Sequence, residues 1–230
     1  MDAAPLAGCR SSLRLALYSD QVIAANRKLD REVLRLIEGS ARRIGYLTSA
    51  PDPARRFFAA KQAYYAQVGA IDLVYFDPED LTVPGARDAL LACDAVHLTG
   101  GDTRGYLARL ERAALVAPLR AFALSGKPLI GTSAGAILMT PSIAVSALFE
   151  AAIPTDSPDQ AALDLVPFEF FPHLQAYPGH LQSLTDYSRK NGGRPIFAAP
   201  DGDGILVENG VARALGSIVE IRDGAVRARG

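Results

Sequence analysis

Short apolar runs alternate along the chain with longer segments whose apolar residues recur at helical spacing. The runs are nearly continuous, which is typical of parallel strands that are buried on both faces of a sheet. They span residues 13–19, 43–50, 71–77, 95–101 and 128–134. The helical segments lie between them, at 29–41, 53–69, 86–94 and 103–126. This order predicts an α/β fold in three layers, αβα, with a mostly parallel central sheet and any active site at the carboxyl ends of its strands.

The pattern changes after residue 190, where Asp-Gly and Asn-Gly pairs separate short apolar runs. Such pairs suit two-residue hairpin turns, because the central positions of these turns need positive φ. Between the short apolar runs they occur at 201–202, 203–204, 209–210 and 223–224. The sequence therefore predicts hairpins that close the fold, within a single domain that spans residues 1–230 and begins with a flexible segment at 1–12.

Composition narrows the range of functions. Of the 230 residues, 49% are hydrophobic and 21% are charged, which predicts a chain that is globular throughout. Lys and Arg (24) nearly balance Asp and Glu (25), so no strong field would attract nucleic acid. No run reaches the ~20 apolar residues that span a bilayer, and the first residues lack a signal-peptide pattern, so we expect a cytoplasmic protein without a membrane partner. The two cysteines, Cys9 and Cys93, are expected to be reduced thiols.

A GxSxG pattern, from Gly131 to Gly135, joins the last apolar run to a helical segment. Small residues permit a sharp strand-to-helix turn there, a nucleophile elbow at the C-terminal edge of the sheet, with Ser133 at its apex. The Ala134 amide and the start of the new helix would face a developing oxyanion. The pattern therefore predicts that Ser133 is a nucleophile. The alternatives are a chance match, or a turn that binds phosphate through its amides.

A serine nucleophile needs a general base, and the chain has three histidines. His97 lies inside an apolar strand, where a histidine is more often a core residue with satisfied hydrogen bonds. His180 begins a helical segment, where it would cap the helix or face solvent. His173 follows Pro172 at the end of an aromatic-rich run, from which a loop could bring it over Ser133. We therefore predict that His173 is the base.

A third, acidic residue should orient the histidine and stabilise the imidazolium that forms during attack. The interval between Ser133 and His173 offers five candidates: Glu150, Asp156, Asp159, Asp164 and Glu169. The two aspartates at 156 and 159 lie in a Ser-, Pro- and Asp-rich segment that is typical of a solvated loop, and Asp164 suits a turn. Glu150 ends an apolar segment, where an ionised carboxylate needs a partner. Glu150 is therefore the favoured third member.

A second glycine-containing turn, HLTGGDT at 97–103, ends another strand before a helix. Asp102 or Thr103 could cap that helix. Glycine lets backbone approach a substrate closely, so the Gly101 amide is the candidate for the second oxyanion donor beside Ala134. Asp102, Thr103 and Arg104 are candidate substrate-binding residues.

These segments together resemble the aspartyl dipeptidase (peptidase E) family of serine peptidases, peptidase family S51, which includes the cyanophycinases. The resemblance rests on the nucleophile segment at 131–136, the Gly-Gly turn at 97–103, the histidine segment at 162–174 and the segment APDGDGILVENG at 199–210. It implies a fold like that of class I glutamine amidotransferase domains. It also implies Ser133 as nucleophile and His173 as base, with the amides of Gly101 and Ala134 as the oxyanion hole.

The resemblance implies a serine exopeptidase, dipeptidase-like, that hydrolyses short peptides without a metal or organic cofactor. The family pattern has an aspartate fifteen residues after the serine, where this chain has Leu148, so a shift to Glu150 would complete the triad. Segment 175–190 has no counterpart of the family's substrate-carboxylate arginine, which leaves the side-chain preference and the exopeptidase direction open. A monomer and a homodimer are both compatible. The alternatives are an esterase or amidase of α/β-hydrolase type and a catalytically silent anion-binding domain.

Overall fold

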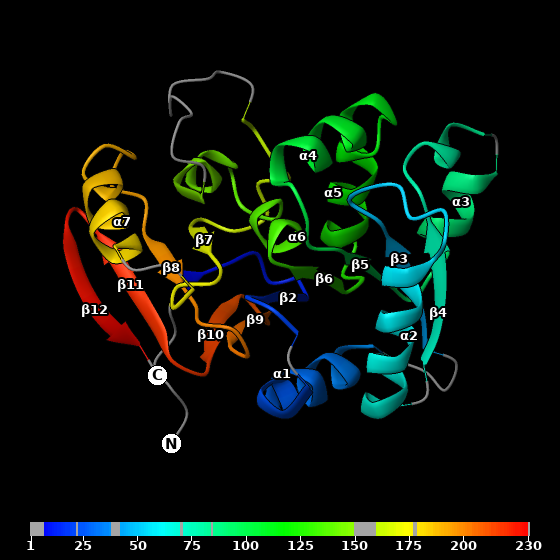
Figure 1. The fold of residues 1–230 in the computed structure, drawn as a ribbon, viewed down its shortest axis with the longest axis horizontal. Coiled ribbons are helices and arrows are strands. Elements are labelled where there is room, and N and C mark those ends of the chain that lie inside the picture. Colours follow the sequence, from blue (N-terminus) through cyan, green and yellow to red (C-terminus); the bar gives the residue numbers. More distant parts are fainter. Residues whose placement is uncertain are drawn as a thin grey trace.

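A central sheet of eight strands carries most of the fold in the computed structural model (Figure 1). The structure describes residues 7–21, 23–37, 42–69, 71–83, 85–149, 160–176 and 179–229. Five neighbouring strands are parallel: β2 (Leu15–Tyr18), β6 (Leu129–Thr132), β5 (Ala95–Leu98), β3 (Arg42–Leu47) and β4 (Ile71–Phe76). Three antiparallel strands extend the sheet beyond β2: β9 (Gly204–Glu208), β10 (Val211–Leu215) and β1 (Ala7–Gly8).

Helices cover both faces of this sheet. One face packs against α1 (Ile23–Leu36) and α2 (Arg56–Val68). The other face packs against α3 (Ala86–Leu91), α4 (Thr103–Arg112), α5 (Val116–Leu124) and α6 (Ala134–Ile137). Successive residues of β2 point to opposite faces. Tyr18 therefore packs in the apolar cluster on the side of α1 and α2, and Leu17 packs in the cluster on the side of α3 to α6. The continuous apolar runs are therefore explained by burial on both faces.

A second sheet lies beside the first and contains four strands (Figure 1). Its order is β12 (Ala225–Arg229), β11 (Ile218–Arg222), β8 (Ile196–Ala198) and β7 (Glu169–Phe171). β7 and β8 are parallel and are connected through α7 (His180–Ser188), whereas β11 and β12 form an antiparallel hairpin. Short 3-10 helices occur at η1 (Asp80–Thr82) and η2 (Ala144–Phe149). Phe170 and Ile221 of the small sheet share one apolar cluster with Leu17 of the large sheet.

The sequence predicted the five parallel strands and the helices between them, and the structure confirms a mixed α/β fold with a large central sheet. The hairpin turns at 209–210 and 223–224 are also confirmed, because they connect β9 to β10 and β11 to β12. The hairpin predicted at 201–202 is wrong, since β8 and β9 belong to different sheets. The separate four-stranded sheet was not predicted.

The N-terminal segment contacts the large sheet from residue 7 onward. Residues 1–6 lie outside the described part of the chain, but Ala7–Gly8 forms β1 and pairs with β10. The Cys9 amide then donates a hydrogen bond to the Gly210 carbonyl at 2.7 Å. The flexibility predicted for residues 1–12 stays a prediction. Cys9 and Cys93 are free thiols. None of the described helices combines the length and the apolar character needed to cross a membrane.

Candidate active site

Ser133 occupies a strained turn between β6 and α6, with φ 50 and ψ −111. Two glycines of the GxSxG pattern make this turn possible, because neither position has room for a side chain. A Cβ at Gly135 would lie 2.1 Å from the Leu98 carbonyl oxygen, and a Cβ at Gly131 would lie 2.5 Å from the Gly135 carbonyl oxygen. The helix can therefore start directly against β5 and β6. The strand-turn-helix context predicted for Ser133 is present.

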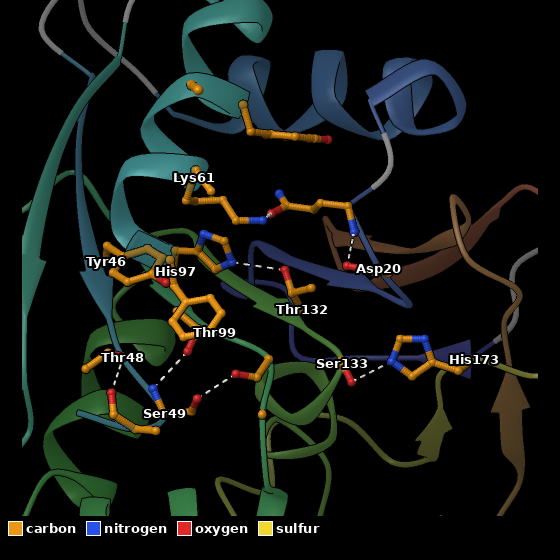
Figure 2. A pocket seen from close by; sticks show the side chains of 18 of the residues that line it. Asp20, Tyr46, Thr48, Ser49, Lys61, His97, Thr99, Thr132, Ser133 and His173 are labelled. Carbon is orange, nitrogen blue, oxygen red and sulfur yellow. Dashed lines mark hydrogen bonds between the residues drawn. The ribbon is translucent and has the colours of Figure 1, made fainter. Parts of the chain in front are cut away.

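His173 reaches Ser133 from the small sheet. It follows the carboxyl end of β7, and its ring Nε2 lies 2.8 Å from Ser133 Oγ (Figure 2). The other ring nitrogen, Nδ1, lies 2.6 Å from Asp201 Oδ1. A carboxylate can accept only from a protonated nitrogen, so this contact places the proton of neutral His173 on Nδ1 and leaves Nε2 free to accept the serine proton. The three side chains form one hydrogen-bonded chain.

Asp201 makes the contact with His173 Nδ1 for which the sequence predicted other acids. Glu150, with Asp156 and Asp159, lies outside the described residues. Asp164 pairs instead with Arg120 at 3.1 Å. The Glu169 carboxylate is buried and accepts a hydrogen bond from Tyr187 at 2.8 Å, and it also pairs with Arg194.

Asp201 was missed for two reasons. The predicted acids all lie in the interval between Ser133 and His173, whereas Asp201 comes later in the chain. The pair Asp201-Gly202 also predicts a hairpin turn. The available signal was its place in the APDGDGILVENG segment, directly after a fully apolar short strand, where a carboxylate at a strand end is a candidate for chemistry.

The remaining two histidines have structural surroundings. His97 is fully buried, with Nδ1 3.1 Å from the Tyr65 hydroxyl and Nε2 3.0 Å from Thr132 Oγ1. Burial, aided by the positive charge of Lys61, holds the pKa of His97 well below its usual value. The prediction of a satisfied core histidine is confirmed. His180 begins α7 as predicted, but it is buried against the rings of Phe149 and Phe171 rather than exposed, and burial lowers its pKa.

The turn between β5 and α4 lies against Ser133. A Cβ at Gly100 would be 3.5 Å from Ser133 Cβ, and one at Gly101, whose φ is 146, would be 2.4 Å from Ser49 Oγ. The amides of Gly101 and Ala134 donate no hydrogen bond to another described residue. Both amides are therefore available for an acceptor on a substrate.

The three candidate substrate-binding residues of this turn differ in placement. Asp102 caps α4, because its carboxylate accepts hydrogen bonds from the amides of Arg104 and Gly105. Asp102 and Thr103 line a cavity beside Ser133. Arg104 is exposed and does not line that cavity.

Ser133, His173 and Gly101 line two cavities at the same time. The larger cavity has a volume of about 960 Å³ and extends from Ser133 past Tyr46 and His97 to α2 (Figure 2). The smaller one has a volume of about 430 Å³ and is lined by Thr103, Ile137 and Phe149 among others. A bound molecule could therefore extend to both sides of the serine oxygen.

The larger cavity contains groups of both charges. The amine of Lys61 donates a hydrogen bond to Gln21, and Asp20 lines the same wall (Figure 2). Burial lowers the pKa of Lys61 to about 8, although the carboxylates of Asp20 and Asp30 oppose this shift. Within the described chain, no three His, Cys, Asp or Glu side chains are grouped so that they could hold a metal ion.

The fold has counterparts among solved structures. The chain is similar in fold to the crystal structure of a protein from Listeria monocytogenes EGD-e that is provisionally described as a peptidase E. That match has a TM-score of 0.63 at 20% identity and covers 91% of this chain and 98% of the other. A peptidase from an acI-B1 Actinobacterium matches with a TM-score of 0.69 at 12% identity, over 94% and 93% of the two chains. At these identities the likeness establishes a mixed α/β fold of the peptidase E type.

Sequence comparison identifies the family. The profile of peptidase family S51 matches residues 17–215, so the chain belongs to that family. Peptidase E of Shewanella oneidensis is 31% identical over 140 residues, and peptidase E of Haemophilus influenzae is 27% identical over 137 residues. The first match covers 58% of this chain and 58% of the relative, and the second covers 56% and 62%. The matched part therefore spans about three fifths of the length of these curated relatives.

Proposed function

We propose that this chain is a serine peptidase that hydrolyses short peptides through an acyl-enzyme on Ser133. The observation that carries the proposal is the hydrogen-bonded chain from Ser133 Oγ to His173 Nε2 at 2.8 Å and from His173 Nδ1 to Asp201 at 2.6 Å. Nucleophile, base and orienting acid are in contact in the order that acyl transfer requires. Membership of peptidase family S51 supports the same reaction.

In the first half of the reaction, Ser133 Oγ attacks the carbonyl carbon of the scissile peptide while His173 Nε2 accepts the hydroxyl proton. Asp201 stabilises the resulting imidazolium through Nδ1. The negative charge that develops on the substrate oxygen is stabilised by the amides of Gly101 and Ala134, which have no described acceptor of their own. The strained turn at Ser133 acts as the nucleophile elbow.

In the second half, the C–N bond breaks and His173 gives its proton to the leaving amine, which departs with a complete N–H. Water then attacks the carbonyl carbon of the ester on Ser133 while His173 accepts one proton from the water. The bond from that carbon to Ser133 Oγ breaks, and His173 returns the proton to Oγ. The products are a free carboxylic acid and the regenerated serine. No other co-reactant is needed.

Short peptides are the proposed substrates because two cavities of about 960 and 430 Å³, a size that suits a small molecule, flank Ser133. A dipeptide or tripeptide would place one side of its scissile bond in each cavity. Asp20 and Lys61 in the larger cavity offer a partner of either sign for a free terminus. A glutamine amidotransferase-like topology and a cytoplasmic location stay predictions.

The test combines labelling with turnover. A fluorophosphonate should label the wild type at Ser133, and Ser133→Ala should not be labelled, whereas Ser183→Ala should label normally because Ser183 lies exposed on α7 away from both cavities. A mixed library of dipeptides and tripeptides, read by mass, should be cleaved only by proteins that keep Ser133. The products would also reveal the exopeptidase direction. A folded wild type that neither labels nor cleaves would favour the anion-binding alternative.

A further inference from the structure

Ser19 contacts both His173 and Asp201 of the candidate triad. It follows the carboxyl end of β2 in the large sheet, and its side chain is fully buried. Its hydroxyl oxygen accepts a hydrogen bond from the His173 backbone amide at 2.7 Å. The same oxygen lies 3.0 Å from the Ala199 carbonyl oxygen and 3.1 Å from Asp201 Oδ1. One side chain of the large sheet therefore contacts both residues that the small sheet contributes.

These contacts hold the backbone amide of His173 and the Oδ1 atom of Asp201, and both residues belong to the candidate triad. The His173 backbone has φ 56, an unfavourable left-handed conformation for a residue with a side chain. The Ser19 hydroxyl accepts a hydrogen bond from the His173 amide in this conformation. Asp201 Oδ1 is the oxygen that also contacts His173 Nδ1. Since a hydroxyl has a single proton, Ser19 can donate either to Asp201 or to Ala199, but it accepts from His173 in both cases.

We infer that Ser19 is a positioning residue of the hydrolytic reaction, which holds the His173 backbone and the Asp201 carboxylate so that Nε2 stays aimed at Ser133. This inference rests on the proposed function. Ser19 does not line either cavity, so it has no direct route to the substrate. Its removal should therefore lower kcat and leave KM nearly unchanged, because the geometry of proton transfer is disturbed and the binding walls are not.

A buried serine elsewhere in the chain provides a matched control. Ser188 is also fully buried, its hydroxyl accepts a hydrogen bond from the Gly224 amide at 2.9 Å, and it donates to the Thr185 carbonyl at 2.8 Å. It thus makes the same kinds of contact as Ser19, but between α7 and the β11–β12 hairpin. Ser188→Ala should lose similar stability without affecting the triad.

The experiment compares Ser19→Ala, Ser188→Ala and the wild type. Ser19→Ala is expected to reduce kcat by about 10- to 100-fold with KM within about twofold, a size typical of misplaced catalytic groups. Ser188→Ala should keep both constants. A second readout does not depend on turnover: the proton shared by His173 Nδ1 and Asp201 should give a low-field NMR resonance, assigned by its loss in Asp201→Asn. We expect this resonance to broaden or vanish in Ser19→Ala and to persist in Ser188→Ala.

The outcomes separate this inference from the proposed function. Unchanged kcat and an unchanged resonance in Ser19→Ala would overturn the inference, as would equal losses of kcat in the two alanine variants. If Ser19→Ala does not fold, Ser19→Cys keeps the volume but replaces the hydroxyl with a weak hydrogen-bonding group, and normal kcat in that variant would also overturn it. A wild type that does not label at Ser133 would overturn the proposed function, whereas the resonance would still show whether Ser19 holds the contact between His173 and Asp201.

Discussion

The eight-stranded and the four-stranded sheets contribute to the candidate site in different ways. The large sheet presents Ser133 through a turn of five residues, whose geometry follows from two glycines that cannot carry a Cβ. The small sheet presents His173 and Asp201 from the ends of β7 and β8, two parallel strands paired through Phe171 and Ala198. The geometry of the proposed nucleophile thus depends on neighbouring residues, whereas the proposed base and acid meet through the pairing of strands whose functional residues lie 28 positions apart.

The two sheets meet at the contact between Ser133 and His173. The proposed reaction should therefore depend on how the sheets are aligned. The Ala199 amide bonds to the Phe171 carbonyl at 2.9 Å and the Leu174 amide bonds to the Ala199 carbonyl at 3.1 Å, which fixes the two strand ends relative to each other. Ser19 then ties this unit to the large sheet. A substitution in one sheet should therefore leave the structure of the other sheet unchanged.

The largest expected effect comes from removing the charge that the small sheet supplies. Asp201→Asn should keep the fold and lower kcat by about 10⁴-fold, because an amide no longer holds the Nδ1 proton or stabilises the imidazolium. The measurement is steady-state hydrolysis of the best peptide from the library.

Asp203→Asn is the matched control for that variant, since Asp203 lies two residues away and its carboxylate accepts from the Ser217 amide at 2.7 Å instead. It should keep kcat within a few-fold. If Asp201→Asn remained active and Glu150→Gln lost its activity, the third member would be the glutamate that the sequence favoured.

An intermediate effect is expected from crowding the turn of the large sheet. Gly135→Ala would place a Cβ 2.1 Å from the Leu98 carbonyl oxygen, so the strand and the helix must separate. We expect a loss of about 3 kcal/mol in the free energy of unfolding, measured with urea, together with weaker labelling of Ser133. Gly8→Ala is the control, because nothing lies within 4 Å of a Cβ there. An unchanged unfolding midpoint for Gly135→Ala would show that the turn has room to spare.

The smallest expected effect is a pH dependence that originates in the large sheet. His97 faces Tyr46, Tyr65 and Thr132, and its folded pKa is far below the usual value of 6.5. Below pH 6.5 the unfolded chain binds a proton that the folded chain does not, so stability falls as pH decreases, by about 1.4 kcal/mol per pH unit from this group. His97→Gln removes this contribution. Urea unfolding of both proteins at pH 7 and pH 5.5 measures the difference, and parallel losses would rule out the assigned role of His97.

The sequence predicted the part of the site that depends on neighbouring residues. Ser133, the small residues around it and the strand-helix context lie within a few positions of one another, so their pattern carries the geometry. His173 could be selected because only three histidines exist and the other two had better structural explanations. The five parallel strands followed from their continuous apolar character, which burial on both faces requires.

Only the tertiary structure revealed the candidate acid Asp201, the second sheet and the contacts of Ser19. An Asp-Gly pair has the same local preference for a turn whether it closes a hairpin, as at 223–224, or connects two different sheets, as at 201–202. Which case applies depends on whether β8 pairs with β9 or with β7 and β11, and that choice is made by long-range burial and hydrogen bonding. Local preferences therefore determined the turn that presents Ser133, the proposed nucleophile, and the long-range pairing of β7 with β8 placed His173 and Asp201 beside it.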